Sequence, residues 1–232
     1  MSTKNVLLSY SGSGNHLVRF FIELLTERPT LGWSMVKDDV PIYKAVFAEV
    51  IPFNITEASV PIFRKEHHVP KPEETVEQLI LIVRNPREVI VRQGGINENT
   101  LIDGLLSNTQ LIENNCLWYC SLVKYYIDFK GPKLLLFYED LITKRKESIQ
   151  KLYDFIQPNK PEKLEYALKN IDRLYAMSKG GKSRVWLGSK SNGTTDYYFD
   201  KLKYSSKEYL TKTVNAFLYH PLFKDVLAPY TL

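Results

Sequence analysis

The chain has 232 residues, with 31 Lys plus Arg against 26 Asp plus Glu, which gives a formal net charge of +5. Hydrophobic residues at 44% and aromatic residues at 12% suffice for a full core and exclude a disordered chain, and two cysteines exclude a disulfide scaffold. No apolar run approaches the ~18 residues of a membrane span, so we expect one cytoplasmic domain over residues 1–232. The small positive excess indicates an anionic ligand without identifying its class.

Short apolar runs alternate with amphipathic segments along the chain. In the first third of the chain, we expect a strand over 5–10, a helix from 16 to the Arg-Pro pair at 28–29, and candidate strands over 46–51 and 60–65. In the middle, we expect a strand over 78–83, a helix from 86, a helix over 111–129 and a strand over 133–138. The remainder predicts a helix from 139 to the proline at 158, a helix over 164–174, a loop over 178–195 and a helix over 206–218. This alternation predicts an α/β fold with a central parallel sheet.

A glycine-rich loop follows the first predicted strand. Residues 9–15 read Ser-Tyr-Ser-Gly-Ser-Gly-Asn and lead directly into a helix. Small residues let backbone N–H groups converge, and the helix adds its positive end, so the segment is suited to an anion. It lacks the Gly-Lys-Ser/Thr ending of a Walker A loop, and an ordinary tight strand-to-helix turn is the alternative.

Two further segments place polar side chains at strand ends. Residues 81–89 read Leu-Ile-Val-Arg-Asn-Pro-Arg-Glu-Val, so Arg84 stands where open α/β sheets bind ligands, and its guanidinium could grip a phosphate. A structural ion pair with Glu88 is the alternative. Residues 136–141 read Leu-Phe-Tyr-Glu-Asp-Leu, where Asp140 could simply cap the next helix.

The three segments together resemble the sulfotransferase family, whose members take a sulfuryl group from 3′-phosphoadenosine-5′-phosphosulfate (PAPS). The family's versions read roughly Ser-Tyr-Pro-Lys/Arg-Ser-Gly-Asn/Thr-Thr-Trp, Val-Arg-Asn-Pro-Lys-Asp-Val and Tyr-Glu-Asp-Leu, in the same order and context. The resemblance covers residues 5 to about 157, with a vaguer tail to about 190. It implies a three-layer, P-loop-NTPase-like α/β fold, PAPS as donor, adenosine 3′,5′-bisphosphate (PAP) as product, and no metal.

The resemblance also implies which residues bind the donor. The loop with its following helix start would cradle the 5′-phosphosulfate, Arg84 would hold the 3′-phosphate, and Tyr138 would lie near the adenine. A late Gly- and Lys-rich segment stands where the family closes over the 3′-phosphate, although a solvated basic loop explains it equally well. The implied donor-binding residues are Ser11, Gly12, Ser13, Gly14, Asn15, His16, Arg84, Arg92, Tyr138, Lys179, Gly180 and Lys182.

A histidine general base is the family's other requirement, because the attacking hydroxyl must lose a proton. Residues 63–70 read Phe-Arg-Lys-Glu-His-His-Val-Pro and stand where the family has Lys-Thr-His. The Lys-x-His spacing favours His67, whereas the spacing to the proline favours His68. We favour His67; without the resemblance, a surface loop would be the simpler interpretation.

The sequence departs from the family pattern in the loop. Gly12 stands in place of the lysine or arginine that assists the leaving phosphate, and Leu17 replaces a tryptophan. Arg92 replaces a serine that binds the 3′-phosphate, a change that keeps phosphate affinity. The missing loop cation could come from elsewhere, with Arg19, Arg64 and Lys65 as candidates.

Three functions therefore stand beside one another. The first is a PAPS-dependent sulfotransferase that acts on a hydroxyl of a sugar or small molecule, with neither nucleic acid nor a membrane as partner. The second is a P-loop-type kinase, which the missing Walker lysine disfavours. The third is a non-catalytic PAP- or nucleotide-binding module, which Gly12 favours. We expect Cys116 and Cys120 to be reduced core residues, and Trp118 to serve in packing.

Overall fold

The computed structural model describes residues 3–32, 60–93, 109–180, 197–200, 202 and 204–230. The predicted strand over 46–51 and the segments 94–108 and 181–196 lie outside these ranges. Within the described part, no helix has the length and apolar character to cross a membrane.

The centre of the fold is a parallel sheet, which has five strands in the described ranges. The strands are β1 (Asn5–Ser9), β2 (Thr30–Leu31), β3 (Phe63–Glu66), β4 (Gln78–Val83) and β5 (Lys133–Phe137). Their order across the sheet is β2-β3-β1-β4-β5, with β1 paired in parallel to both β3 and β4. The chain therefore builds one side of the sheet first and crosses over β1 to build the other.

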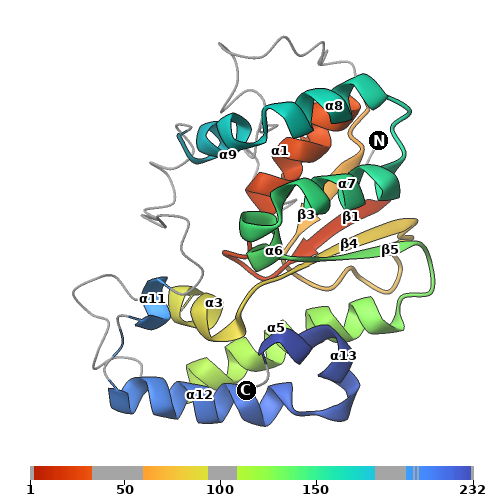
Figure 1. Cartoon of the computed structure of the whole chain (residues 1–232). Helices are drawn as coiled ribbons and strands as arrows, with labels where there is room; N and C mark the ends of the chain where they lie inside the picture. Colours follow the sequence, from red (N-terminus) through yellow and green to blue (C-terminus); the bar gives the residue numbers. More distant parts are fainter. Residues whose placement is uncertain are drawn as a thin grey trace.

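Helices cover both faces of this sheet (Figure 1). One face carries α1 (Asn15–Thr26), α6 (Tyr138–Thr143), α7 (Arg145–Ile156), α8 (Pro161–Lys169) and α9 (Ile171–Gly180). The other carries α3 (Pro86–Gln93), α5 (Thr109–Asp128), α11 (Tyr197–Asp200), α12 (Tyr204–Leu218) and α13 (Lys224–Leu227), with 3-10 turns at Pro221–Phe223 and Ala228–Tyr230. The predicted three-layer α/β class with a central parallel sheet is thus confirmed.

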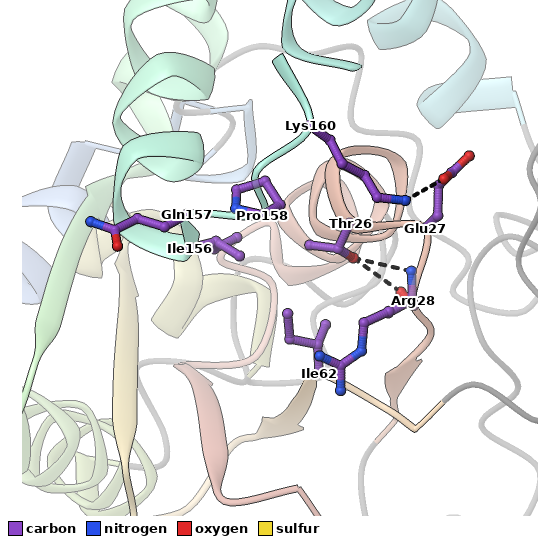
Figure 2. A pocket seen from close by; sticks show the side chains of 8 residues that line it. All are labelled: Thr26, Glu27, Arg28, Ile62, Ile156, Gln157, Pro158 and Lys160. Carbon is purple, nitrogen blue, oxygen red and sulfur yellow. Dashed lines mark hydrogen bonds and ion pairs between the residues drawn. The ribbon is translucent and has the colours of Figure 1, made fainter. Parts of the chain in front are cut away.

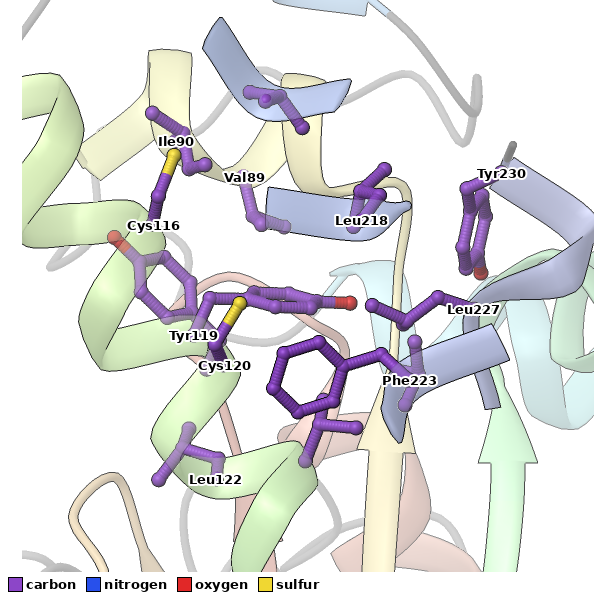
Figure 3. Close-up of a cluster of buried hydrophobic side chains, with 14 of the residues drawn as sticks. Val89, Ile90, Cys116, Tyr119, Cys120, Leu122, Leu218, Phe223, Leu227 and Tyr230 are labelled. Atoms are coloured by element: carbon purple, nitrogen blue, oxygen red, sulfur yellow. The ribbon is translucent and has the colours of Figure 1, made fainter. Parts of the chain in front are cut away.

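The two cores follow from the alternation of side chains along the central strands. Val6 and Leu8 of β1 point into the core beneath α5, whereas Leu7 points into the core beneath α1. Strand β4 alternates in the same way, so both strands need apolar residues on both faces of the sheet. Figure 3 shows the first core, where Tyr119 of α5 lies among side chains of α3 and the C-terminal segment.

The predicted helices differ from the structure in three places. The single helix expected after residue 139 is two helices, because Lys144 at φ −118° and ψ 54° interrupts it between α6 and α7. The helix expected over 164–174 is also two, broken at Asn170. Helix α9 then continues to Gly180, so residues 178–180 of the predicted loop are helical, and the rest of that loop lies outside the described residues. One-residue breaks leave the apolar periodicity nearly intact, which is why the pattern missed them.

Candidate functional site

The predicted site segments meet at one edge of the sheet. Strands β1, β3, β4 and β5 are parallel, so their carboxyl ends lie on the same edge. The glycine loop follows β1, His67 follows β3, Arg84 follows β4 and Tyr138 follows β5. Because the chain crosses over β1, this edge is the switch point at which open α/β sheets bind ligands.

The loop after β1 requires glycine at two positions. Gly12 has φ +83° and Gly14 has φ +93°, both in the left-handed region that side chains disfavour. The Ser13 N–H donates to the Tyr10 carbonyl at 3.2 Å and closes the turn. Gly14 then caps α1 without a side-chain hydrogen bond, so this helix start has neither a carboxylate nor a hydroxyl of its own.

Two buried side chains complete the loop. Asn15 donates from Nδ2 to Ser9 Oγ at 3.2 Å, which ties the helix start to the end of β1. Ser13 is fully buried, and its hydroxyl has no hydrogen-bond partner among the described residues. A buried hydroxyl without a partner costs about 1–3 kcal/mol, so this atom fits an anionic group that would accept from it.

Arg84 crosses from the end of β4 to the loop. It is 1% exposed, and one guanidinium nitrogen donates to the Gly12 carbonyl at 3.0 Å. A second nitrogen lies 3.4 Å from Glu88, so the structural ion pair that the sequence left open is present as well. The guanidinium carbon stands 4.1 Å from the centre of the Tyr138 ring.

Tyr138 packs directly on Gly14. A Cβ atom at Gly14 would lie 2.6 Å from Cδ2 of the Tyr138 ring. Arg84, Tyr138 and Gly14 therefore form one stack that joins the ends of β4 and β5 to the loop.

A helix cap fixes the direction in which Arg84 leaves its strand. Asn85 accepts the Arg87 N–H at 3.0 Å, and Pro86 begins α3 at a position where no N–H is needed. Glu139 accepts the Asn85 N–H at 3.0 Å and also bonds the Tyr230 hydroxyl. Sequence reasoning missed Glu139 and Tyr230, and it suggested Asp140 as a helix cap, whereas Asp140 pairs with Lys144 at 3.0 Å.

The two histidines have different environments. His67 is 9% exposed, and its Nδ1 lies 2.7 Å from the Ser9 carbonyl. A carbonyl oxygen only accepts, so Nδ1 carries the hydrogen and the neutral ring keeps its lone pair on Nε2. His68 is exposed and stacks on Trp118 at 5.0 Å and 8°.

Trp118 supports both histidines. Its indole N–H donates to the His67 carbonyl at 2.7 Å, and its ring also contacts Tyr10 at 4.6 Å. The predicted packing role of Trp118 is therefore combined with a hydrogen bond that holds the histidine segment. Tyr10 in turn donates to Asn115 at 2.5 Å, and burial raises its pKa.

Arg19, Arg64 and Lys65 are the sequence candidates for the missing loop cation, and Arg92 is a fourth cationic residue to compare with them. Arg19 donates to Thr30 at 2.8 Å, and Arg64 pairs with Glu74, so both are engaged in structural contacts. Lys65 is buried on β3 in register with Leu7 of β1. Arg92 reaches the loop, where its Nε would lie 3.6 Å from a Cβ atom at Gly12.

The remaining predicted donor-binding residues lie at two places. Ser11 and His16 are partly exposed at the two ends of the loop. Lys179 and Gly180 end α9, and the side chain of Lys179, like all of Lys182, lies outside the described part of the chain.

A cavity of about 450 Å³ lies at the other end of α1 (Figure 2). Its lining includes Glu27 and Arg28, which follow the last turn of the 12-residue helix, so it is about 18 Å along the helix axis from the loop. An ion pair between Lys160 and Glu27 crosses its wall. The cavity is thus separate from the strand ends that carry the predicted chemistry.

Cys116 and Cys120 are buried and free on α5, as predicted. Burial raises the pKa of Cys116 to about 12 and that of Cys120 to about 11. These thiols are therefore uncharged at neutral pH and behave as apolar core residues. Among the described residues, no group of three or more His, Cys, Asp or Glu side chains is arranged to hold a metal ion.

No protein-family model matches the sequence, and no curated protein matches it. Among solved structures, the chain is similar to the mouse sulfotransferase SULT7A1 complexed with PAP, with a TM-score of 0.62 and 15% sequence identity. The match covers 99% of this chain and 89% of the mouse chain. At this identity the similarity concerns the fold: the chain has the P-loop-NTPase-like, three-layer α/β fold of a sulfotransferase.

Proposed function

We propose that the protein is a PAPS-dependent sulfotransferase that acts on a hydroxyl of a sugar or another small molecule. One observation carries the proposal: the imidazole of His67 is hydrogen-bonded to Ser9, the residue from which the glycine loop starts. A candidate base and a candidate anion cradle are thereby attached to the same strand end. A general base beside an anion site is a combination that promotes the transfer of an anionic group to a hydroxyl.

The loop supplies the features that an anionic donor needs. The Ser13 hydroxyl is buried without a partner among the described residues, and the start of α1 carries no acidic side chain. Both favour a phosphosulfate at this point. We assign the 3′-phosphate to Arg84 and the adenine to the neighbourhood of Tyr138, as the family resemblance implies, and their stacking supports a common subsite.

The residues act on the transfer as follows. His67 Nε2 takes the proton of the acceptor hydroxyl while its oxygen forms a bond to sulfur, and the bond between sulfur and the phosphate oxygen breaks. PAP leaves with the electron pair of that bond, and the acceptor becomes a sulfate ester. Ser13 and the N–H groups at the start of α1 donate to the charge that develops on the leaving phosphate.

The acceptor would bind beside the histidines. The His68 ring stacks on Trp118, and their neighbours in the sequence, Val69 and Leu117, are exposed. A flat aromatic surface with apolar neighbours suits the face of a sugar or another ring.

The first test measures binding and turnover together. Purified protein is titrated with PAP by calorimetry, and transfer of labelled sulfate from PAPS is followed over a panel of sugars and small hydroxyl compounds. We expect micromolar PAP binding and turnover with at least one acceptor. If the protein neither binds PAP nor transfers sulfate to any acceptor, the proposal is refuted.

The second test concerns the base. His67→Gln should abolish turnover and leave PAP affinity unchanged, whereas His68→Gln should mainly raise the KM of the acceptor. Tight PAP binding without turnover would instead favour the non-catalytic module, for which Gly12 in place of the loop cation is the specific observation. ATP- and magnesium-dependent stabilisation would favour a kinase.

A further inference from the structure

Two guanidinium groups flank Gly12 in the described part of the chain. Arg84 donates to the Gly12 carbonyl at 3.0 Å. Arg92, from the last turn of α3, stands on the Cα side of the same residue, where a Cβ atom at Gly12 would lie 3.6 Å from its Nε and 4.0 Å from its Cζ. The space into which a side chain of residue 12 would extend therefore begins at the Arg92 guanidinium.

The backbone conformation at Gly12 disfavours a side chain at this position. Gly12 has φ +83°, and a residue with a Cβ atom in this region is strained by about 1–2 kcal/mol. The loop in this conformation therefore favours glycine and disfavours a lysine at position 12. A cation that reaches the same place from α3 needs no strained residue.

Both guanidinium groups lie near one carboxylate in the described part of the chain. Glu88 is fully buried and lies 3.4 Å from Arg84 and 4.0 Å from Arg92, so two guanidinium groups share one carboxylate. Glu88 also accepts the Phe199 N–H at 2.9 Å, which spreads its charge further. Arg92 keeps 14% of its side chain exposed, in contrast to the almost fully buried Arg84. Of the two arginines, Arg92 is the one better able to meet a ligand.

We propose that Arg92 supplies the cation that the glycine loop lacks, and that it contacts the 5′-phosphate side of the donor at Gly12. This inference rests on the proposed function and deepens it. It differs from the family resemblance, which puts a residue at this position on the 3′-phosphate. The geometry favours the loop because the Arg92 guanidinium stands where a side chain of residue 12 would extend.

Three nucleotide probes separate the two assignments: PAP, adenosine 5′-monophosphate and adenosine 3′-monophosphate. We expect Arg92→Ala to weaken PAP and the 5′-monophosphate by the same factor, about 10- to 100-fold for one charged hydrogen bond, and to leave the 3′-monophosphate unchanged. Arg92→Lys should recover part of the loss. Arg173→Ala, on the exposed surface of α9, is the matched control and should bind all three probes like the wild type.

The outcomes are distinguishable. If the wild type binds PAP but Arg92→Ala binds it equally well, the inference is overturned and the proposed function stands. A loss confined to PAP and the 3′-monophosphate also overturns it, because Arg92 would then contact the other phosphate. If the wild type does not bind PAP at all, both fail. Unfolding midpoints without ligand show whether a variant is folded. If Arg92→Ala is not folded, the comparison of Arg92→Lys with the wild type provides the test.

Discussion

Replacement of Gly14 by alanine should damage the candidate site more than the same change two residues earlier. Both glycines have positive φ, +83° at Gly12 and +93° at Gly14, so alanine is strained at either by about 1–2 kcal/mol. At Gly12 the new methyl group meets its nearest described atom at 3.6 Å, an ordinary contact. At Gly14 it would lie 2.6 Å from the Tyr138 ring, which must move.

The clash with the Tyr138 ring sets the difference in stability between the two variants. Overpacking of this kind costs about 1–3 kcal/mol beyond the backbone strain. For a chain of this size, that difference lowers the melting temperature of Gly14→Ala by about 2–12 °C relative to Gly12→Ala. Displacement of the Tyr138 ring also removes the surface on which Arg84 stacks at 4.1 Å, so PAP affinity should fall together with stability.

The assay is urea unfolding of the two glycine variants, of Tyr138→Ala, and of Gly14→Ala combined with Tyr138→Ala. In the Tyr138→Ala background the clash is absent, so the cost of Gly14→Ala should drop to that of Gly12→Ala, a coupling of about 1–3 kcal/mol. Equal costs for the two glycine variants, or no coupling with Tyr138, would refute the reasoning.

Three further predictions follow from the electrostatics. Burial raises the pKa of Cys116 to about 12 and of Cys120 to about 11, from a usual value of 9.0, so the folded state holds these protons longer than the unfolded state. Unfolding midpoints should therefore fall as pH rises above about 9, with a smaller fall in the Cys116→Ala variant; an identical fall would contradict this. Two lysines at the start of α8 hold the pKa of Glu27 below its usual 4.5, so the stability this pair provides is present above that pH and lost below it. Glu27→Gln should then cost less than about 1 kcal/mol at pH 7 and progressively less as the pH falls below 4.5, as thermal melts would show. Tyr230→Phe removes the hydrogen bond to Glu139 and should destabilise by about 1–3 kcal/mol, with earlier proteolysis of the C-terminal segment as the direct readout.

The strongest sequence signals were the central strands. Residues 79–83 are apolar throughout because β4 packs against helices on both faces, and the structure has a strand over 78–83 with the predicted bounds. Strand β2 has only two residues and was missed, since so short a run carries no period. The breaks at Lys144 and Asn170 were missed for the related reason that one non-helical residue barely shifts a helical pattern.

The site was predictable in its position and not in its contacts. Residues at the ends of parallel strands must share one edge of the sheet, so the order of the motifs was sufficient to group the loop, the histidines and Arg84. The hydrogen bond that selects the His67 tautomer depends on the register between β1 and β3, which sequence does not reveal. The same holds for the approach of Arg92 to Gly12, which depends on how α3 packs beside the loop.

This dependence on packing also bears on how such a site can diverge. Residues 11–15 carry no charged side chain, and the guanidinium groups next to the loop come from the end of β4 and from α3. A cationic residue within the loop is part of the short loop motif and can be recognised in the sequence. A cationic side chain from a neighbouring helix lies outside that motif and cannot. The fold can therefore stay close to that of a sulfotransferase over 99% of the chain while identity falls to 15%. On this argument, the charge around Gly12 is the property to compare between such chains, because different residues can provide it.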